Sequence, residues 1–211
     1  MLASYYLPRR RLNYHLGYLF LVSMFATPVL AQDDQTNSLP IPEGYQAVYQ
    51  RSVIQDDVPM TLTRYERQDG QNTGLQGEHF STLYSKDGTL MGFMNIASSV
   101  VAHPLPSEEE SERVAREFLA SQAPDLLTNM RITSIATYTK PLRLTATNET
   151  VDVSGVRVKA YNNSSSNWFW VVVGNGNQIL SYERDVGWSY IRFQRSSEYW
   201  LDDQWLLNQG Y

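Results

Sequence analysis

Hydrophobic and polar residues alternate along most of the chain after residue 45, with the period of two that is typical of β-strands. Short segments rich in glycine, asparagine and aspartate separate the alternating stretches. Lys86-Asp87-Gly88 and Gly174-Asn-Gly-Asn177 are turn sequences, because these residue types accept the positive φ that a tight hairpin requires. We expect strands at residues 45–54, 60–65, 79–84, 89–96, 131–139, 151–161, 168–173, 178–186 and 188–195.

One segment follows a helical period instead. Its apolar residues recur at the 3.6-residue spacing of an amphipathic helix: Val114, Ala115, Phe118 and Leu119. Ser107 and Glu110 form a capping box before this stripe, and Pro124 stops it, so we expect a helix at residues 107–122. Its first turn carries three acids that the helix dipole favours, so they do not indicate a metal or acid–base site: Glu108, Glu109 and Glu110.

These elements predict an α+β fold. We expect an antiparallel sheet, or two sheets, with the one main helix packed on a face and a short closing helix at residues 197–207. Strand, turn and strand occur both before and after the helix. Residues 45–211 are therefore one α+β domain or two similar halves, 45–103 and 104–211, and the pattern leaves open whether they share one sheet.

The first 31 residues have the three parts of a secretory signal peptide. Arg9, Arg10 and Arg11 precede an apolar run of about 14 residues, which is shorter than the ~20 residues of a transmembrane helix. Val29 and Ala31 place small side chains before a cleavage site. We expect a cleaved signal peptide at 1–31, a flexible leader at 32–44 and a periplasmic or secreted protein, with an uncleaved anchor as the alternative.

Composition narrows the function classes. The 211 residues include no cysteine, which excludes disulfides, thiolate metal sites and a cysteine-linked lipid anchor. Removal of residues 1–31 leaves 14 basic and 22 acidic residues, a net charge of −8. An acidic chain is a poor partner for nucleic acid or an anionic membrane, so we expect neither after signal cleavage. An exported chain without cysteine fits a bacterial envelope.

Catalytic motifs are absent from the sequence: G-x-S-x-G, P-loop, G-x-G-x-x-G and H-E-x-x-H. His79 and His103 are not spaced as zinc ligands, and we read each as structural or on the surface. Asp56-Asp57 and Asp202-Asp203 are adjacent pairs whose carboxylates point apart, so we interpret them as a turn and as the solvated side of the closing helix. We expect no catalytic residue, metal or cofactor; the alternative is a hydrolase that uses scattered carboxylates and His79.

Aromatic residues concentrate at the C-terminal end. All five tryptophans lie in the last 44 residues, and Trp168 and Trp170 share one strand face while Phe169 takes the other. These rings form either a core or an exposed surface for a sugar or a protein. Because Trp, Tyr and Arg dominate binding hot spots, the candidate binding residues on the second interpretation are Trp168, Trp170, Trp188, Tyr190, Arg192 and Trp200.

The Glu-rich helix capped by Ser107 is followed by strands that end in the hairpin Val171-Val-Val-Gly-Asn-Gly-Asn-Gln-Ile-Leu-Ser-Tyr-Glu183. This order resembles the bacterial PepSY domain over about residues 80–186, and residues 83–91 look like the end of a preceding unit. The resemblance implies an exported, non-catalytic module of the kind found in protease pro-regions and periplasmic regulators, with no catalytic residues to transfer.

Three functions follow. The first is a binding module that recognises or regulates a protein or enzyme of the cell envelope. The second is binding of a carbohydrate or small ligand through the aromatic C-terminal surface. The third is the hydrolase.

Overall fold

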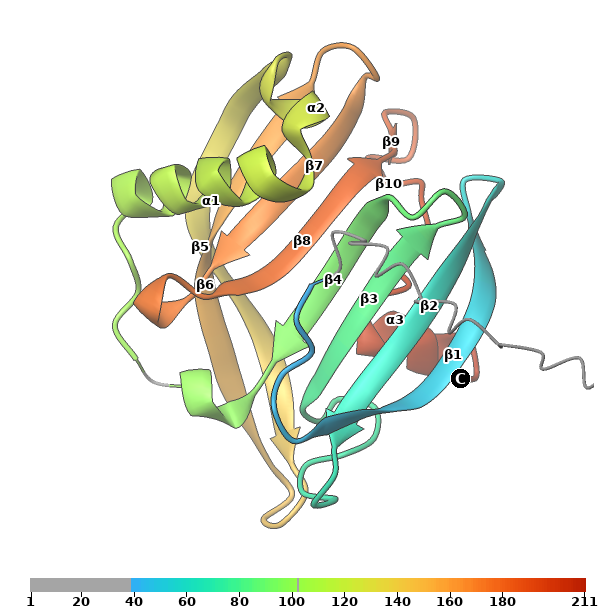
Figure 1. Cartoon of the computed structure of the whole chain (residues 1–211), viewed down its shortest axis with the longest axis vertical. Helices are drawn as coiled ribbons and strands as arrows, with labels where there is room; N and C mark the ends of the chain where they lie inside the picture. The colour runs from blue at the N-terminus through green and yellow to red at the C-terminus, as the bar shows by residue number, and fades with distance from the viewer. Residues whose placement is uncertain (1–38, 102) are drawn as a thin grey trace, which may run out of the picture. The chain divides into compact units, whose positions relative to one another are not determined.

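Eight strands form one antiparallel sheet in the order β1-β2-β3-β4-β8-β7-β6-β5 (Figure 1). The computed structural model describes residues 39–101 and 103–211, and these belong to one compact unit. The predicted signal peptide and residues 32–38 of the predicted leader lie outside the described residues. The strands are β1 (Tyr45–Gln55), β2 (Val58–Arg67), β3 (His79–Ser85), β4 (Leu90–Ile96), β5 (Met130–Leu144), β6 (Glu149–Asn162), β7 (Asn167–Val173) and β8 (Ile179–Val186).

The sheet consists of two four-stranded meanders, β1–β4 and β5–β8, which join through their last strands. β4 pairs with β8, with Phe93 opposite Tyr182 and Met94 opposite Ser181. The stretches before and after the helical segment therefore share one sheet. The predicted α+β class is confirmed in this broad form: an antiparallel sheet dominates, and a few helices accompany it.

Alternation along each strand gives the sheet two apolar faces, each covered by a different helix. On one face, α1 (Glu108–Gln122) packs against the β5–β8 meander. On the other face, α3 (Asp203–Asn208) contributes Leu206 to a second core. Figure 1 shows α1 in front of β5–β8 and α3 behind β1–β4. Core residues on the α1 face include Phe80, Phe93, Val114, Leu119, Phe169 and Tyr182, and those on the α3 face include Leu62, Leu83, Met94, Val172, Trp200 and Leu201.

The start of α1 follows its capping sequence. The Ser107 hydroxyl accepts a hydrogen bond from the Glu110 backbone N–H at 3.1 Å, and the three glutamates occupy the first turn as expected. Pro124 opens a separate short helix, α2 (Pro124–Leu127). No helix in the described part of the chain has the length and apolar character needed to cross a bilayer.

The turn sequences adopt the conformations that their residues favour. Asp56 and Asp57 have φ values of 47° and 64° and connect β1 to β2, which confirms the turn predicted there. Gly88 has a φ of 83° in the β3–β4 turn, and Gly176 has a φ of 63° between β7 and β8. Two 3₁₀ turns complete the fold, Ser98–Val100 and Asn175–Asn177.

The predicted strand at residues 188–195 is wrong. Only β9 (Trp188–Ser189) and β10 (Gln194–Arg195) are extended, and they pair with each other as a separate hairpin. Both edges of β8 are already occupied, by β4 and β7, so the chain after Val186 has no strand beside it to join. Phe193, with a φ of 50°, turns the chain back.

The closing helix also differs from its prediction. It begins at Asp203 rather than Ser197, because the Asp202 side chain accepts a hydrogen bond from the Trp205 N–H at 2.8 Å and caps the helix there. The interpretation of Asp202-Asp203 as a solvated pair is wrong for Asp203, which is only 9% exposed. Residues 196–202 instead cross the α3 face of the sheet, where Trp200 and Leu201 join the core.

Candidate functional site

A cleft opens on the α3 face of the sheet, between the β5–β8 meander and the C-terminal segment. Its cavity volume is about 240 Å³. Side chains from β5, β6, β7 and β8 form its floor, and residues of β9, β10 and the segment after them form its wall. We call it the aromatic cleft, and its principal lining residues are Tyr138, Lys140, Arg157, Lys159, Trp168, Trp170, Glu183, Trp188, Arg195, Tyr199 and Asp202.

Strand register explains why these side chains meet. Arg157 and Lys159 are two positions apart on β6, and Trp168 and Trp170 are two positions apart on β7, so each pair points to the same side. Lys159 lies directly opposite Trp170 in the pairing of β6 with β7. Phe169, between the tryptophans, is buried on the α1 face. Alternation along β7 thus places Phe169 in the core and Trp168 and Trp170 in the cleft.

Cations and aromatic rings alternate through the cleft. The Lys159 ammonium lies 4.3 Å from the ring centre of Trp168 and 5.6 Å from that of Trp188. The Arg195 guanidinium lies 4.3 Å from the Tyr199 ring centre. The Arg157 guanidinium lies 5.2 Å from the ring centre of Tyr138. Such contacts stabilise a cation without cancelling its charge.

Two of the four cations in the cleft are neutralised by acids. Lys140 forms an ion pair with Asp202, and Arg195 forms one with Glu183. Within residues 39–101 and 103–211, Arg157 and Lys159 form no ion pair. Burial, together with the neighbouring positive charge of Arg157, lowers the pKa of Lys159.

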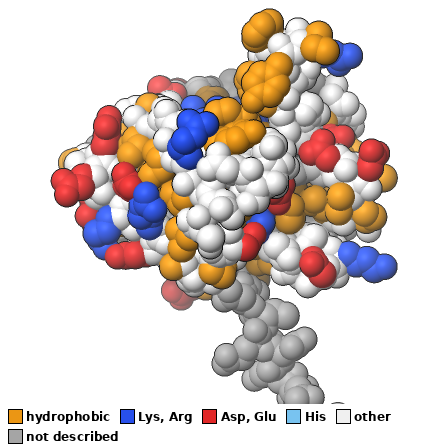
Figure 2. Space-filling view, turned by 90° about the horizontal axis from the view of Figure 1, so that it is seen from above, with side chains coloured by type: hydrophobic (Ala, Val, Ile, Leu, Met, Phe, Trp, Pro, Cys, Tyr) orange, Lys and Arg blue, Asp and Glu red, His pale blue; other side chains and the backbone are white. Residues whose placement is uncertain are grey.

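The β9–β10 loop, Tyr190-Ile191-Arg192-Phe193, extends from the wall of the cleft. Tyr190 is 65% exposed, Ile191 93% and Phe193 81%. Large apolar side chains are seldom this exposed when several are adjacent. The hairpin lies near the top of Figure 1, and the view from above in Figure 2 shows hydrophobic side chains projecting from the surface with basic side chains near them.

The structure brings five of the six candidate binding residues to one region. Trp168, Trp170 and Trp188 line the aromatic cleft, and Tyr190 and Arg192 belong to the β9–β10 loop. Trp200 does not join them. It lies in the core of the α3 face, where its Nε1 donates a hydrogen bond to the Ile54 carbonyl at 2.9 Å.

Arg157 and Lys159 were missed by the reasoning from the sequence, and Arg195, which lies in the same C-terminal region as Arg192, was not among the six candidates. The sequence does contain a signal for Arg157 and Lys159. They stand two residues apart on one strand, and the next strand along the chain is rich in tryptophan. Arg195 is placed by tertiary contacts: its Nε donates to the Ser197 carbonyl at 3.1 Å, and its ion pair with Glu183 ties the C-terminal segment to β8.

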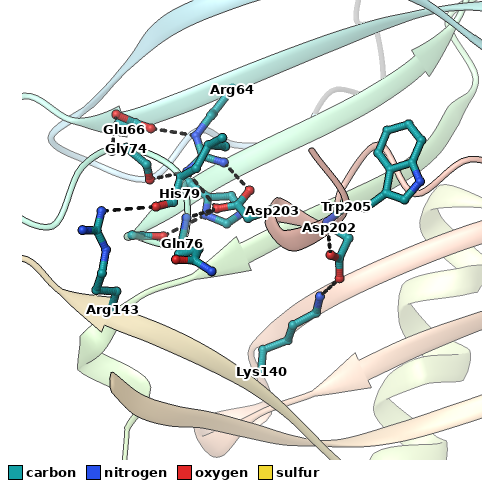
Figure 3. Close-up of polar contacts among 12 residues, drawn as sticks. Arg64, Glu66, Gly74, Gln76, His79, Lys140, Arg143, Asp202, Asp203 and Trp205 are labelled. Carbon is teal, nitrogen blue, oxygen red and sulfur yellow. Dashed lines mark hydrogen bonds and ion pairs between the residues drawn. The ribbon is translucent and has the colours of Figure 1, made fainter. Parts of the chain in front are cut away.

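A buried polar cluster holds the start of α3 on the sheet (Figure 3). We call it the polar anchor; it comprises Arg64, Glu66, His79 and Asp203. Arg64 is 1% exposed and donates to both carboxylate oxygens of Asp203, at 2.7 and 3.2 Å. Its Nε donates to Glu66 at 2.7 Å. The Gln76 backbone N–H supplies a further hydrogen bond to Asp203 at 2.6 Å.

His79 is the residue of this cluster with catalytic potential. It lines a second cavity of about 180 Å³ together with Asp203, and its Nδ1 lies 3.6 Å from an Asp203 carboxylate oxygen. The same Nδ1 donates to the Gly77 carbonyl at 2.9 Å, so the neutral ring carries its lone pair on Nε2. Nε2 is buried and makes no hydrogen bond in the described part of the chain. Burial lowers the pKa of His79.

The second cavity adjoins the aromatic cleft. Met94, Lys140 and Asp202 line both, so the Lys140–Asp202 ion pair stands between them. Figure 3 shows Lys140 reaching from its strand to Asp202 at the start of α3. The described residues include no cluster of three or more His, Asp or Glu side chains arranged to hold a metal ion. His103 is exposed and belongs to neither cavity.

Comparisons with known proteins give no family. No family model, no curated protein and no solved structure matches this chain. The resemblance to the PepSY domain therefore stays a prediction. The proposals below rest on the geometry of the aromatic cleft and of the β9–β10 loop.

Proposed function

We propose that this chain is an exported, non-catalytic binding module that recognises a partner protein of the bacterial cell envelope through the β9–β10 loop. The observation that carries the proposal is the exposure of Ile191 and Phe193 on a loop beside the rim residue Trp188. Apolar and aromatic anchors that enter a partner's pocket supply most of the binding energy in protein interfaces. Arg192 adds a cation that suits an acidic rim on the partner.

The arrangement of the helices supports a binding role for this side of the molecule. α1 covers one face of the β5–β8 meander. On the opposite face the aromatic cleft stays open between the meander and the C-terminal segment, next to the β9–β10 hairpin. β9 pairs with β10, and the loop between them is exposed. A loop whose ends are already paired loses less conformational entropy on binding than an unpaired segment does.

The hydrolase is less well supported. His79 and Asp203 do lie together beside a cavity, which that alternative requires. However, Asp203 is bound by Arg64 and the Gln76 N–H, and Nε2 of His79 has no hydroxyl partner among the described residues. A base that activates a nucleophile needs such a partner within hydrogen-bond reach. The contacts fit a structural anchor instead.

Site-specific photocrosslinking tests the proposal. The full chain is expressed in the source organism with benzoylphenylalanine at position 191, and a matched chain carries it at Val48, an exposed apolar position on β1. We expect a protein adduct of defined mass from position 191 and none from position 48. Excess wild-type chain should suppress the adduct, whereas the double variant Ile191→Ser, Phe193→Ser should not. Equal adducts from both positions, or none from 191, would refute the proposal.

A further inference from the structure

The aromatic cleft contains an excess of positive charge in an acidic protein. Four cations line it, Lys140, Arg157, Lys159 and Arg195, against two acids, Glu183 and Asp202. The chain after residue 31 has a net charge of −8. A cleft lined by an excess of one sign of charge concentrates ions of the opposite sign, so the positive excess favours an anion there.

The excess is located at Arg157 and Lys159. Both are half-buried, and among the described residues neither forms a hydrogen bond or ion pair with a carboxylate. Their Cα atoms are two residues apart on one strand, a separation of roughly 7 Å, so one small anion can contact both side chains. Their only described partners are ring faces: Tyr138 for Arg157, and Trp168 and Trp188 for Lys159.

The walls of the cleft suit a flat group. Trp168, Trp170 and Trp188 line it and remain partly exposed, with Trp188 at 39%. Indole faces pack against rings with apolar surfaces, either aromatic or the C–H face of a sugar. The volume of about 240 Å³ lies below the roughly 300 Å³ at which drug-sized ligand sites begin, which indicates a ligand of one ring.

We propose that the aromatic cleft binds a small organic anion that consists of one ring and a carboxylate. The carboxylate pairs with Arg157 and Lys159, and the ring stacks on the tryptophans that flank Lys159. Guanidinium and ammonium donors form charge-assisted hydrogen bonds with carboxylates. This inference goes beyond the proposed function, because it concerns the cleft rather than the β9–β10 loop and requires no partner protein.

Two classes of ligand combine one ring with a carboxylate: acidic sugars and aromatic acids. Isothermal titration calorimetry of the full chain with sodium glucuronate and with sodium phenylacetate distinguishes them, and glucose is the neutral control. We expect binding of at least one anion and none of glucose, with affinity that falls as salt rises. Binding of glucuronate alone assigns a sugar ligand, and binding of phenylacetate alone assigns an aromatic one. Absence of binding by both, or equal binding of glucuronate and glucose, overturns the proposal.

Charge-removing variants locate the site. Arg157→Gln and Lys159→Gln should each weaken binding of the anion at least about 10-fold, since each loses a hydrogen bond to a charged group. Arg113→Gln, on exposed α1, removes one positive charge elsewhere and should bind as the wild type does. Circular dichroism checks that the variants fold. If Lys159→Gln fails to fold, Lys159→Met replaces it, because methionine keeps an apolar stem that packs on Trp168. Wild-type affinity in the folded cleft variants overturns the proposal.

Discussion

Arg64 in β2 and Asp203 at the start of α3 are 139 positions apart in the chain and form a bidentate, buried ion pair. This pair fixes the C-terminal segment on the face opposite α1. Because Asp202 and the residues before it form one wall of both cavities, the pair also determines where the aromatic cleft lies.

Breaking this pair should strongly destabilise the fold. Arg64→Met leaves the carboxylates of Asp203 and Glu66 buried without their cation, so we expect the free energy of unfolding to fall by about 3–5 kcal/mol. Arg116→Met removes an exposed ion pair with Glu112 and should cost less than about 1 kcal/mol. Urea denaturation followed by circular dichroism measures both. Similar losses for the two variants would contradict the assignment of the polar anchor.

Acid should reduce stability in two steps. Because burial lowers the pKa of His79 below its ordinary value of 6.5, the unfolded chain takes up a proton that the folded protein refuses. The free energy of unfolding therefore falls as the pH drops below 6.5. Burial raises the pKa of Asp203, but the charge of Arg64 and the hydrogen bonds from Arg64 and the Gln76 N–H outweigh it and hold that pKa below its ordinary value of 3.8. A second loss thus begins below pH 3.8.

The His79→Gln variant separates the two steps. Its unfolding free energy should be nearly independent of pH between 6.5 and 5, while the loss below pH 3.8 remains, because Asp203 keeps Arg64. Urea denaturation across this pH range measures both slopes. An unchanged slope between pH 6.5 and 5 in the variant would show that other groups cause the first step.

Trp200 and Trp188 should respond oppositely to truncation, although both were candidates for binding. Trp200→Ala opens a cavity in the core and leaves the Ile54 carbonyl without its donor, so we expect a loss of about 3–5 kcal/mol in unfolding free energy. Trp188→Ala removes a partly exposed ring and should cost less than about 1 kcal/mol. Chemical denaturation of both variants checks this, and comparable losses would show that Trp188 belongs to the core.

Acrylamide quenching of tryptophan fluorescence should reveal a mixed population. Trp188 is 39% exposed and Trp200 only 9%, so Trp188→Phe should remove the most quenchable component and Trp200→Phe a shielded, blue-shifted one. Stern–Volmer plots of the two variants against the wild type measure this. A uniformly shielded wild type would mean that the cleft is closed in solution.

Local sequence was a good guide where neighbouring residues determine the structure. Ser107 and Glu110 mark the start of α1, because the cap involves residues three apart. Asp56, Asp57 and Gly88 mark turns, because their own backbone preferences decide the conformation. Alternation along residues 168–173 correctly separates Phe169 from Trp168 and Trp170, although it does not say which face is filled.

Distant contacts were beyond such reasoning. Asp203 lies between two polar residues, so its sequence context predicts an exposed side chain. In the structure it is buried, because it pairs with Arg64, which is 139 positions away in the chain. Residues 188–195 read as a strand by composition, but a strand also needs an open edge, and β4 and β7 already occupy both edges of β8.

The sequence by itself determined the eight strands of the main sheet, the turns and the capped helix, since these depend on side-chain periodicity and on contacts within a few residues. Only the tertiary structure decided that β4 and β8 unite the two meanders, that Trp200 is core, and that Arg157 and Lys159 line one cleft with three tryptophans. These outcomes depend on which sheet faces and strand edges stay open after the other elements have packed. Local sequence patterns do not contain this information, because the packing involves residues far apart in the chain.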